Sequence, residues 1–216
     1  MNFNNEINKT LDQIIKERRS MRRFTDRIPS REMVEAIVQA GIFAPYAGLV
    51  GKTLLETRQF IILSKNSGPM EKAKSIILAQ LKKNAKRYNL LVKIIPNLRK
   101  NGTGFAKRLN SMAQNGIPAF ETAPYYIIVG ERKGIPPSQK QSLAHVMQNM
   151  WLKSTALGLG FQLLSLTQTM STNKAFMKLI GLPFGEFEID GCAIGYPDQT
   201  PSERSTISVN EITKWL

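Results

Sequence analysis

Three short apolar segments, separated by long stretches of helical periodicity, constrain the fold of this chain more than any other feature. They are Arg58–Leu63, Ala123–Gly130 and Phe187–Tyr196, and all three contain the β-branched and aromatic residues that strands favour. Because apolar residues run through each segment with little polar alternation, we expect a sheet that helices cover on both faces. The sequence therefore predicts an α/β or α+β fold.

The segments between these strands repeat apolar residues at helical spacing. The predicted helices are residues 5–19, 30–43, 70–113, 139–157, 172–180 and 209–215, and residues 158–166 are predicted to be extended. Helix 70–113 should break near Pro96 and at Asn101–Gly102. Helix 139–157 is apolar on most sides, which predicts a central position. No internal repeat or long linker divides the 216 residues, so we expect one domain.

The composition argues against several kinds of site. Cys192 is the only cysteine and His145 the only histidine, so an intrachain disulfide is impossible and no metal site is predicted. We expect Cys192 to be a buried, inert thiol and His145 to be a packed helical residue rather than a catalytic base. A Gly-x-Ser-x-Gly elbow and a Gly-x-Gly-x-x-Gly nucleotide motif are both absent from the sequence. With no apolar leader or spanning run, a cytoplasmic location is expected.

Four arginines are clustered where the first predicted helix ends. They are Arg18, Arg19, Arg22 and Arg23, with Ser20 among them. Guanidinium groups match phosphate oxygens, and a serine adds a hydroxyl and a backbone N–H, so one interpretation is a phosphate-binding corner. The other is a solvated basic helix end, which the helix macrodipole favours in any case. The residues alone leave both interpretations open.

Positive charge is concentrated in one region of the chain. The formal net charge is +14, and residues 71–110 hold 11 Lys or Arg against the single acid Glu71. A region of this kind is a solvated face, or it binds nucleic acid, an anionic membrane or an acidic electron carrier such as ferredoxin or flavodoxin. Few aromatic residues lie there and no nucleic-acid motif is present, which makes nucleic acid the weaker alternative.

The order of five motifs over about residues 12–212 resembles the nitroreductase family of FMN-dependent oxidoreductases. The motifs are Arg18-Arg-Ser-x-Arg22, Ala44-Pro-Tyr-Ala-Gly48, Ala123-Pro through Val129, Ala156-Leu-Gly-Leu-Gly160, and Ile194-Gly-Tyr-Pro197 followed by Arg204. The resemblance implies an α+β, nitroreductase-like three-layer fold with a central mixed sheet flanked by helices. It also implies a homodimer that exchanges its C-terminal arms. Residues 1–216 would form a single domain with a basic helical insertion at about 70–113.

The resemblance assigns the arginine cluster to FMN. Arg18, Arg19 and Ser20 would hold the phosphate, which carries a charge near −2. Arg22 would lie toward the pyrimidine edge of the flavin, where a positive charge favours the reduced anionic ring. Arg204 would close on the phosphate from the C-terminal segment.

The resemblance also assigns residues near the flavin ring. Pro45, Tyr46 and Ala47 would reach the flavin of the partner subunit, because the family places FMN at the dimer interface. Leu164 and Ser165 would lie beside the ring, near its reactive nitrogen. No catalytic side chain is assigned.

One family segment is missing, and it bears on substrate choice. Where the family commonly has Asn-x-Gln-Pro-Trp, this chain reads Leu49-Val-Gly-Lys-Thr-Leu-Leu-Glu-Thr57. The expected function is transfer of a hydride or electrons from NAD(P)H or a reduced carrier to a small organic acceptor. The alternatives are a non-catalytic flavin-binding protein, or a basic protein that binds anionic partners through residues 71–110.

Overall fold

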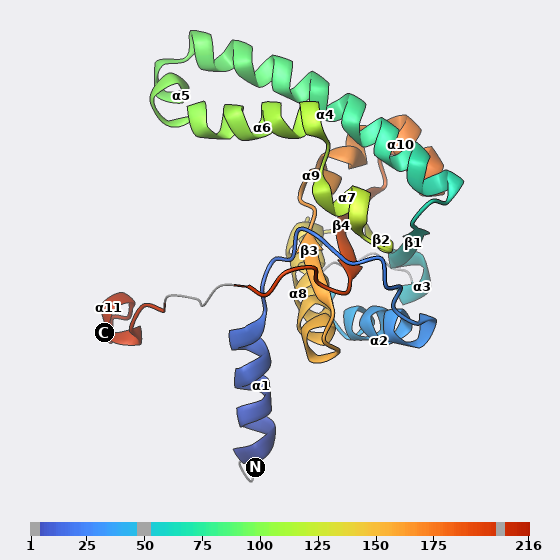
Figure 1. Ribbon diagram of the computed structural model, residues 1–216, viewed down its shortest axis with the longest axis vertical. Helices are drawn as coiled ribbons and strands as arrows, with labels where there is room; N and C mark the ends of the chain where they lie inside the picture. The colour runs from blue at the N-terminus through green and yellow to red at the C-terminus, as the bar shows by residue number, and fades with distance from the viewer. Residues whose placement is uncertain (1–4, 47–52, 202–205) are drawn as a thin grey trace.

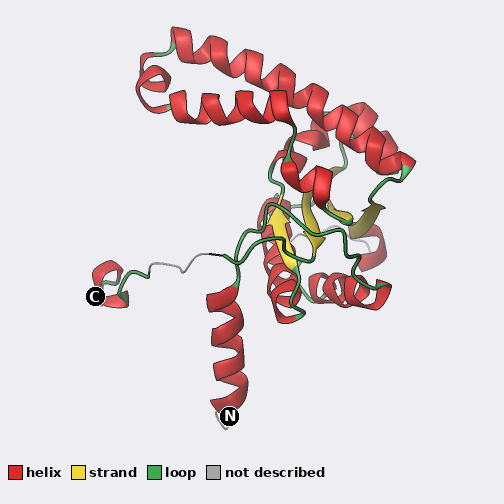
Figure 2. Ribbon diagram, in the orientation of Figure 1, coloured by secondary structure: helices red, strands yellow, loops and turns green. Residues whose placement is uncertain are grey.

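A four-stranded sheet with the order β1-β2-β4-β3 lies at the centre of the molecule (Figures 1 and 2). The computed structural model describes residues 5–46, 53–201 and 206–216. The strands are β1 (Arg58–Ser64), β2 (Tyr125–Arg132), β3 (Gly160–Leu163) and β4 (Phe187–Gly195). The three predicted strands are confirmed, and the segment predicted as extended supplies the fourth.

All three strand pairs are antiparallel. In the described part of the chain, parallel pairing is limited to an isolated bridge between Ser20 and Phe161. The predicted mixed sheet is therefore antiparallel in its four strands, and only the arginine-bearing segment after the first helix adds a parallel contact.

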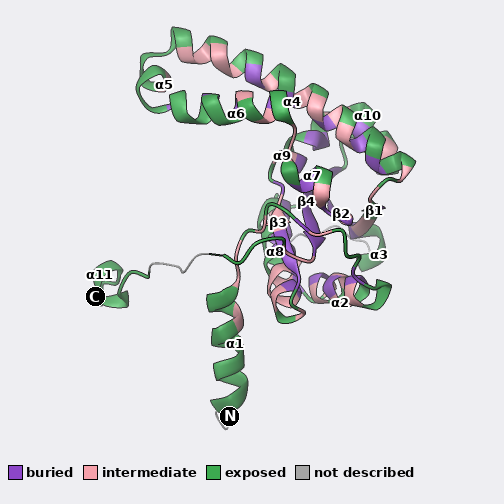
Figure 3. Cartoon of the chain, in the orientation of Figure 1, coloured by how far each residue is buried: buried purple, intermediate pink, exposed green. Residues whose placement is uncertain are grey.

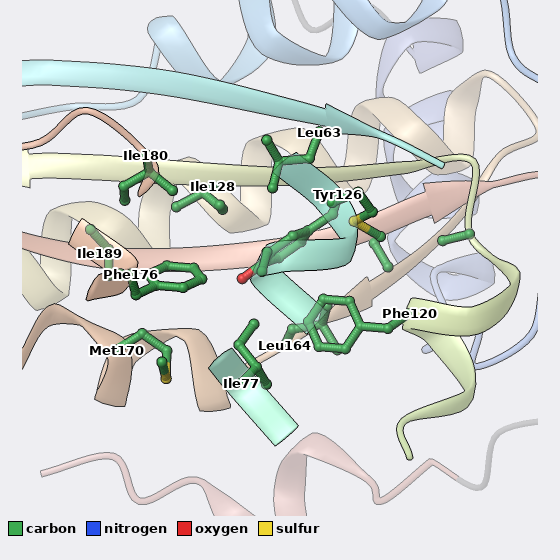
Figure 4. Packing of buried hydrophobic residues seen from close by; sticks show 14 of the residues in the cluster. Leu63, Ile77, Phe120, Tyr126, Ile128, Leu164, Met170, Phe176, Ile180 and Ile189 are labelled. Atoms are coloured by element: carbon green, nitrogen blue, oxygen red, sulfur yellow. The ribbon is translucent and has the colours of Figure 1, made fainter. Parts of the chain in front are cut away.

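Helices cover both faces of the sheet and give the three layers of an α+β fold. Ile127 and Val129 of β2 pack with α2 (Arg31–Ile42) and α8 (Gln139–Ala156) on one face. Tyr126 and Ile128 point to the other face, where Figure 4 shows Tyr126 among apolar side chains of the surrounding helices. Alternate residues of one strand thus enter two separate cores, which is why the strand is apolar along its whole length.

The helices of the second face are α4 (Gly68–Ile94), α7 (Pro118–Thr122), α9 (Leu166–Thr169) and α10 (Lys174–Leu179), with the 3-10 turn η1 (Met170–Thr172). The short helix α3 (Leu54–Thr57) leads into β1. Of these helices, α4 and α10 were predicted from the sequence, whereas α3, α7 and α9 were not. Helix α8 contacts α2 and the strands β2, β3 and β4. Its buried residues lie on one face and the opposite face is exposed, so the predicted central position, buried on most sides, is wrong.

Helices α4 and α6 form a long antiparallel hairpin that extends beyond the sheet (Figure 1). The predicted breaks are confirmed, because α5 (Pro96–Asn101) and α6 (Thr103–Asn115) begin just after them. Leu81 and Ala85 of α4 pack against Leu109 and Ala113 of α6. These four residues form a small core of their own, separate from the two cores at the sheet.

Two helices, one near each end of the chain, contain no buried residue. No residue of α1 (Asn5–Glu17) is buried, although Ile7, Leu11 and Ile15 form an apolar stripe along it. No residue of α11 (Val209–Ile212) is buried either, and Trp215 beyond it is exposed. Figure 3 shows both helices almost entirely exposed, so each presents apolar surface that its own chain does not cover.

The structure also tests the predictions made for the single histidine and the single cysteine. His145 is exposed on α8, so its prediction as a packed residue is wrong; it lies between the apolar positions of that helix. Cys192 is buried in β4, and burial raises the pKa of its thiol, as expected of an inert cysteine. Among the described residues, no three His, Cys, Asp or Glu side chains form a metal site, and no helix could span a membrane.

Candidate functional site

The arginine-bearing segment after α1 is fixed between the ends of two strands. Its Met21 N–H donates to the carbonyl oxygen of Phe161 in β3 at 3.0 Å. Its Thr25 N–H donates to the carbonyl oxygen of Tyr196, just after β4, at 2.9 Å. The backbone of the cluster is therefore held by the sheet, unlike that of a freely solvated helix end.

Gly160 permits this close approach. A Cβ atom at this position would lie 2.9 Å from Cβ of Met21 and 3.1 Å from the Phe24 ring. Real Cβ atoms do not come that close to other carbons, so a side chain here would push the arginine segment away from β3. The second glycine of the Gly158-Leu-Gly160 motif thus has a packing role at the site.

A cavity of about 420 Å³ opens beside the arginine segment. Arg19, Ser20, Arg22 and Arg23 contribute to its wall. Gln199 and Thr200, which lie after β4, complete it on the other side. The lining residues carry guanidinium and hydroxyl groups and none of them is acidic, which suits a phosphate group.

Arg18 has a different environment from the other predicted phosphate ligands. Its guanidinium lies over the ring of Trp151 in α8, 4.2 Å from the ring centroid. Trp151 in turn stacks on Phe161 at 5.0 Å and donates its indole N–H to the carbonyl oxygen of Arg19 at 3.2 Å. Arg18 does not line the phosphate cavity, and it joins the corner to α8 through this cation–π contact.

A second cavity, of about 500 Å³, lies between the α4–α6 hairpin and the segment that follows β3. Leu164 and Ser165, which the sequence places beside a flavin ring, both line it. Gln162 also lines it, and its side-chain oxygen is buried without a hydrogen-bond donor among the described residues. A buried acceptor without a partner is costly, so this oxygen is suited to receive an N–H group from a bound ring.

Strand β3 connects the two cavities. Ser20 of the first cavity bridges to Phe161, and Leu164 of the second lies three residues further along the chain. At about 3.3 Å per residue, the separation is about 10 Å. An elongated ligand with a phosphate at one end and a flat ring at the other suits such a pair of cavities.

The Ala44–Tyr46 loop is held by buried polar contacts. Arg58 of β1 donates to the carbonyl oxygens of Ala44 at 2.8 Å and Pro45 at 3.2 Å. The hydroxyl of Tyr46 donates to the carbonyl oxygen of Arg132 at 3.0 Å. Burial, together with the nearby Glu131 carboxylate, raises the pKa of the Tyr46 phenol, so this hydroxyl stays protonated near neutral pH.

The structure brings together some of the predicted site residues and separates others. Arg19, Ser20 and Arg22 share the first cavity, and Leu164 and Ser165 share the second. Pro45 and Tyr46 line neither of these cavities. Ala47 and Arg204 lie outside the described residues.

The residues that line the two cavities can be compared with the two chemically different ends of FMN. The first cavity supplies positive charge and hydroxyl groups for a dianion, and the second supplies apolar walls and an unpaired acceptor for a ring. These residues fit FMN in its charge, its length and its two chemical ends.

Sequence reasoning missed part of this site. It did not identify Gln199 and Thr200, whose segment is held beside the arginines by backbone contacts of residues 196–198 with residues 23–25. It also missed Gln162, which in the sequence is an ordinary polar residue between apolar neighbours. The buried pair Arg58–Glu131 was missed as well, since neither residue belongs to a recognisable motif.

Comparison with known proteins gives a family and a fold. A family model for the nitroreductase family matches residues 15–196. A comparison with curated proteins gives no match.

Several solved structures share the fold. One is a nitroreductase with bound FMN from Bacteroides fragilis, 20% identical, covering 95% of this chain and 98% of that chain with a TM-score of 0.69. Another is a nitroreductase with bound FMN from Desulfitobacterium hafniense, 22% identical, with coverages of 96% and 98% and a TM-score of 0.66. A nitroreductase-like family protein from Bacillus cereus is 22% identical, with both coverages 95% and a TM-score of 0.61.

Proposed function

The chain belongs to the nitroreductase family, and on this premise we propose that it is an FMN-dependent oxidoreductase. In this proposal it transfers a hydride or electrons from NAD(P)H, or from a reduced electron carrier, to a small organic acceptor. One observation carries the proposal. A phosphate-compatible cavity and an apolar, ring-compatible cavity lie at the two ends of the same short strand, β3. The bound FMN of the two nitroreductase structures supports the choice of cofactor.

The residues of the site divide into three tasks. Arg19 and Ser20 bind the phosphate by charge and hydrogen bonding. Arg22 lines the same cavity, so we assign it to the phosphate in place of the pyrimidine edge that the resemblance implied. Arg18, expected on the phosphate, instead fixes the segment to Trp151. Leu164 and Ser165 position the ring and keep water from one side of it. FMN supplies the redox chemistry, namely acceptance and donation of a hydride, which amino-acid side chains cannot perform.

We also propose that the protein is a homodimer that exchanges its C-terminal arms. The exposed side chains of Leu11 and Ile15 on α1, and of Ile212 and Trp215 around α11, supply apolar surface for such an interface. Apolar surface of this kind is typical of interfaces with a partner. In the dimer, Pro45 and Tyr46 would approach the flavin of the other subunit, which accounts for their distance from both cavities of their own chain.

The cofactor assignment can be tested by absorbance. The wild-type protein should purify yellow, with flavin bands in its spectrum. A double variant, Arg18→Ala with Arg19→Ala, should lose FMN while keeping its helical circular dichroism. The matched control, Lys82→Ala with Lys83→Ala, removes two charges from exposed positions of α4 and should retain FMN. An arginine double variant that remains fully loaded would contradict the site assignment.

The dimer can be tested by truncation. Removing all residues after Pro201 deletes α11 and Arg204, so it should weaken both the dimer and FMN binding. Size-exclusion chromatography with light scattering, combined with the flavin absorbance, measures both effects. An unchanged flavin-loaded dimer would rule out the proposed arm exchange.

The hairpin favours a reduced carrier as one electron donor. Lys82, Lys83, Lys86 and Lys93 of α4 are all exposed, and so is Lys107 of α6. A surface of this charge would attract an acidic protein such as ferredoxin or flavodoxin over long range. NAD(P)H remains the alternative donor, and anaerobic reduction with each donor distinguishes the two.

A further inference from the structure

The cavity beneath the hairpin has walls that favour flat apolar molecules. The ring of Tyr88 in α4 meets the ring of Phe105 in α6 edge to face, with centroids 5.0 Å apart. Leu91 of α4 and Met112 of α6 also line this cavity. A cavity of about 500 Å³ with such walls is in the range that accepts a small organic molecule.

Two guanidinium groups give this apolar cavity its charge. Arg87 of α4 and Arg108 of α6 both line it, and both are exposed. Within the described residues, neither guanidinium group makes an ion pair or a hydrogen bond. None of the residues that line the cavity is acidic. Glu71, the one acid of residues 71–110, instead lies 3.0 Å from Lys74.

We propose that this cavity binds aromatic carboxylates, with Arg87 and Arg108 selecting the carboxylate and the Tyr88–Phe105 wall holding the ring. The inference rests on the proposed function, because Leu164 and Ser165 of the same cavity are the residues assigned to the flavin ring. It deepens that function by giving the acceptor a chemical class. Planar guanidinium groups pair with carboxylates through two parallel hydrogen bonds. The apolar side chains that line the cavity lower the local dielectric constant, which makes this attraction stronger than it is in bulk water.

The experiment compares two probes of nearly equal shape. Isothermal titration calorimetry measures the binding of 4-nitrobenzoate and of the neutral 4-nitrobenzamide to the purified protein at low salt. We expect the carboxylate to bind at least about tenfold more tightly than the amide. In the double variant Arg87→Gln with Arg108→Gln, the two affinities should agree to within about twofold.

The matched control replaces the residue before each arginine. Lys86→Gln with Lys107→Gln removes the same charge from the same two helices, but neither lysine lines the cavity. This control should keep most of the preference for the carboxylate. The inference is overturned by equal affinities in the wild type, by absence of saturable carboxylate binding, by a preference that survives in the arginine variant, or by an equal loss in the lysine variant.

The two proposals fail in different ways. The FMN content of each preparation is measured by absorbance before titration, and the titration is performed whatever that content is. A colourless protein that still discriminates the probes contradicts the oxidoreductase proposal alone. A flavin-loaded protein that does not discriminate them contradicts the carboxylate inference alone.

Discussion

Replacing Glu131 with glutamine should destabilise the protein strongly, because it leaves the buried Arg58 guanidinium without its counter-ion. The side chains of Arg58 and Glu131 are 1% and 0% exposed, and Nη2 lies 2.6 Å from Oε1. Breaking one side of a buried ion pair costs about 3–5 kcal/mol. Carbonyl oxygens of the Ala44–Pro45 loop also accept from Arg58, so we expect the lower end of that range.

The size of the effect translates into a measurable shift of Tm. For a chain of this length, each kcal/mol lowers Tm by about 2–4 °C, so a loss of about 3 kcal/mol lowers it by about 6–12 °C. Thermal unfolding followed by circular dichroism at a fixed protomer concentration measures this shift, because dimerisation makes Tm concentration-dependent. A double variant, Arg58→Met with Glu131→Leu, should recover part of the loss, since it leaves no unpaired charge, although the carbonyl oxygens of Ala44 and Pro45 then lose their donor.

The control for this experiment is an ion pair at the surface of the protein. Arg31 and Glu35 form an exposed ion pair on α2, and Glu35→Gln should change Tm only slightly. If Glu131→Gln lowers Tm no more than this control does, the buried pair does not stabilise the fold.

Three further predictions use other features of the structure. Reduction by an acidic carrier should slow steeply as salt rises if residues 71–110 bind it, whereas reduction by NAD(P)H should change little; stopped-flow measurement of both rates checks this. Burial raises the pKa of Asp190 above its unfolded value, so folding becomes less favourable once the pH is high enough to ionise this carboxyl group in the unfolded chain. Asp190→Asn removes that penalty and should therefore raise Tm at about pH 8. The gain should vanish near about pH 4, where the carboxyl group is protonated in the folded protein. Gly160→Ala should displace Met21 and weaken FMN binding, whereas Gly104→Ala, whose Cβ meets nothing within 4 Å, should leave it unchanged in a fluorescence titration.

Much of the fold follows from local patterns in the sequence. The strands β2 and β4 were predictable because burial on both faces leaves a continuous apolar run. The breaks of the hairpin were predictable because Pro96 and Gly102 act on the backbone locally. Helix α8 was predictable as a helix, but its buried residues recur every three or four positions and lie on one face, so the expectation that it is buried on most sides was wrong.

The details of the site depend on contacts between distant parts of the chain. Arg18 belongs to the phosphate motif by sequence, yet its guanidinium lies on Trp151, which is 133 positions away in the chain. Arg87 and Arg108 are two of many basic residues in their region, and only the pairing of α4 with α6 directs both to one cavity. Local sequence patterns carry no information about such contacts between residues that are far apart in the chain.

The small core shared by α4 and α6 has a consequence for how the hairpin can diverge. Because Leu81, Ala85, Leu109 and Ala113 hold the two helices to each other, turns can be added or removed at the far end without touching the packing around the strands. Natural variants can thus change the hairpin wall of the second cavity one helical turn at a time. The redox centre and its specificity would then be free to evolve at separate rates.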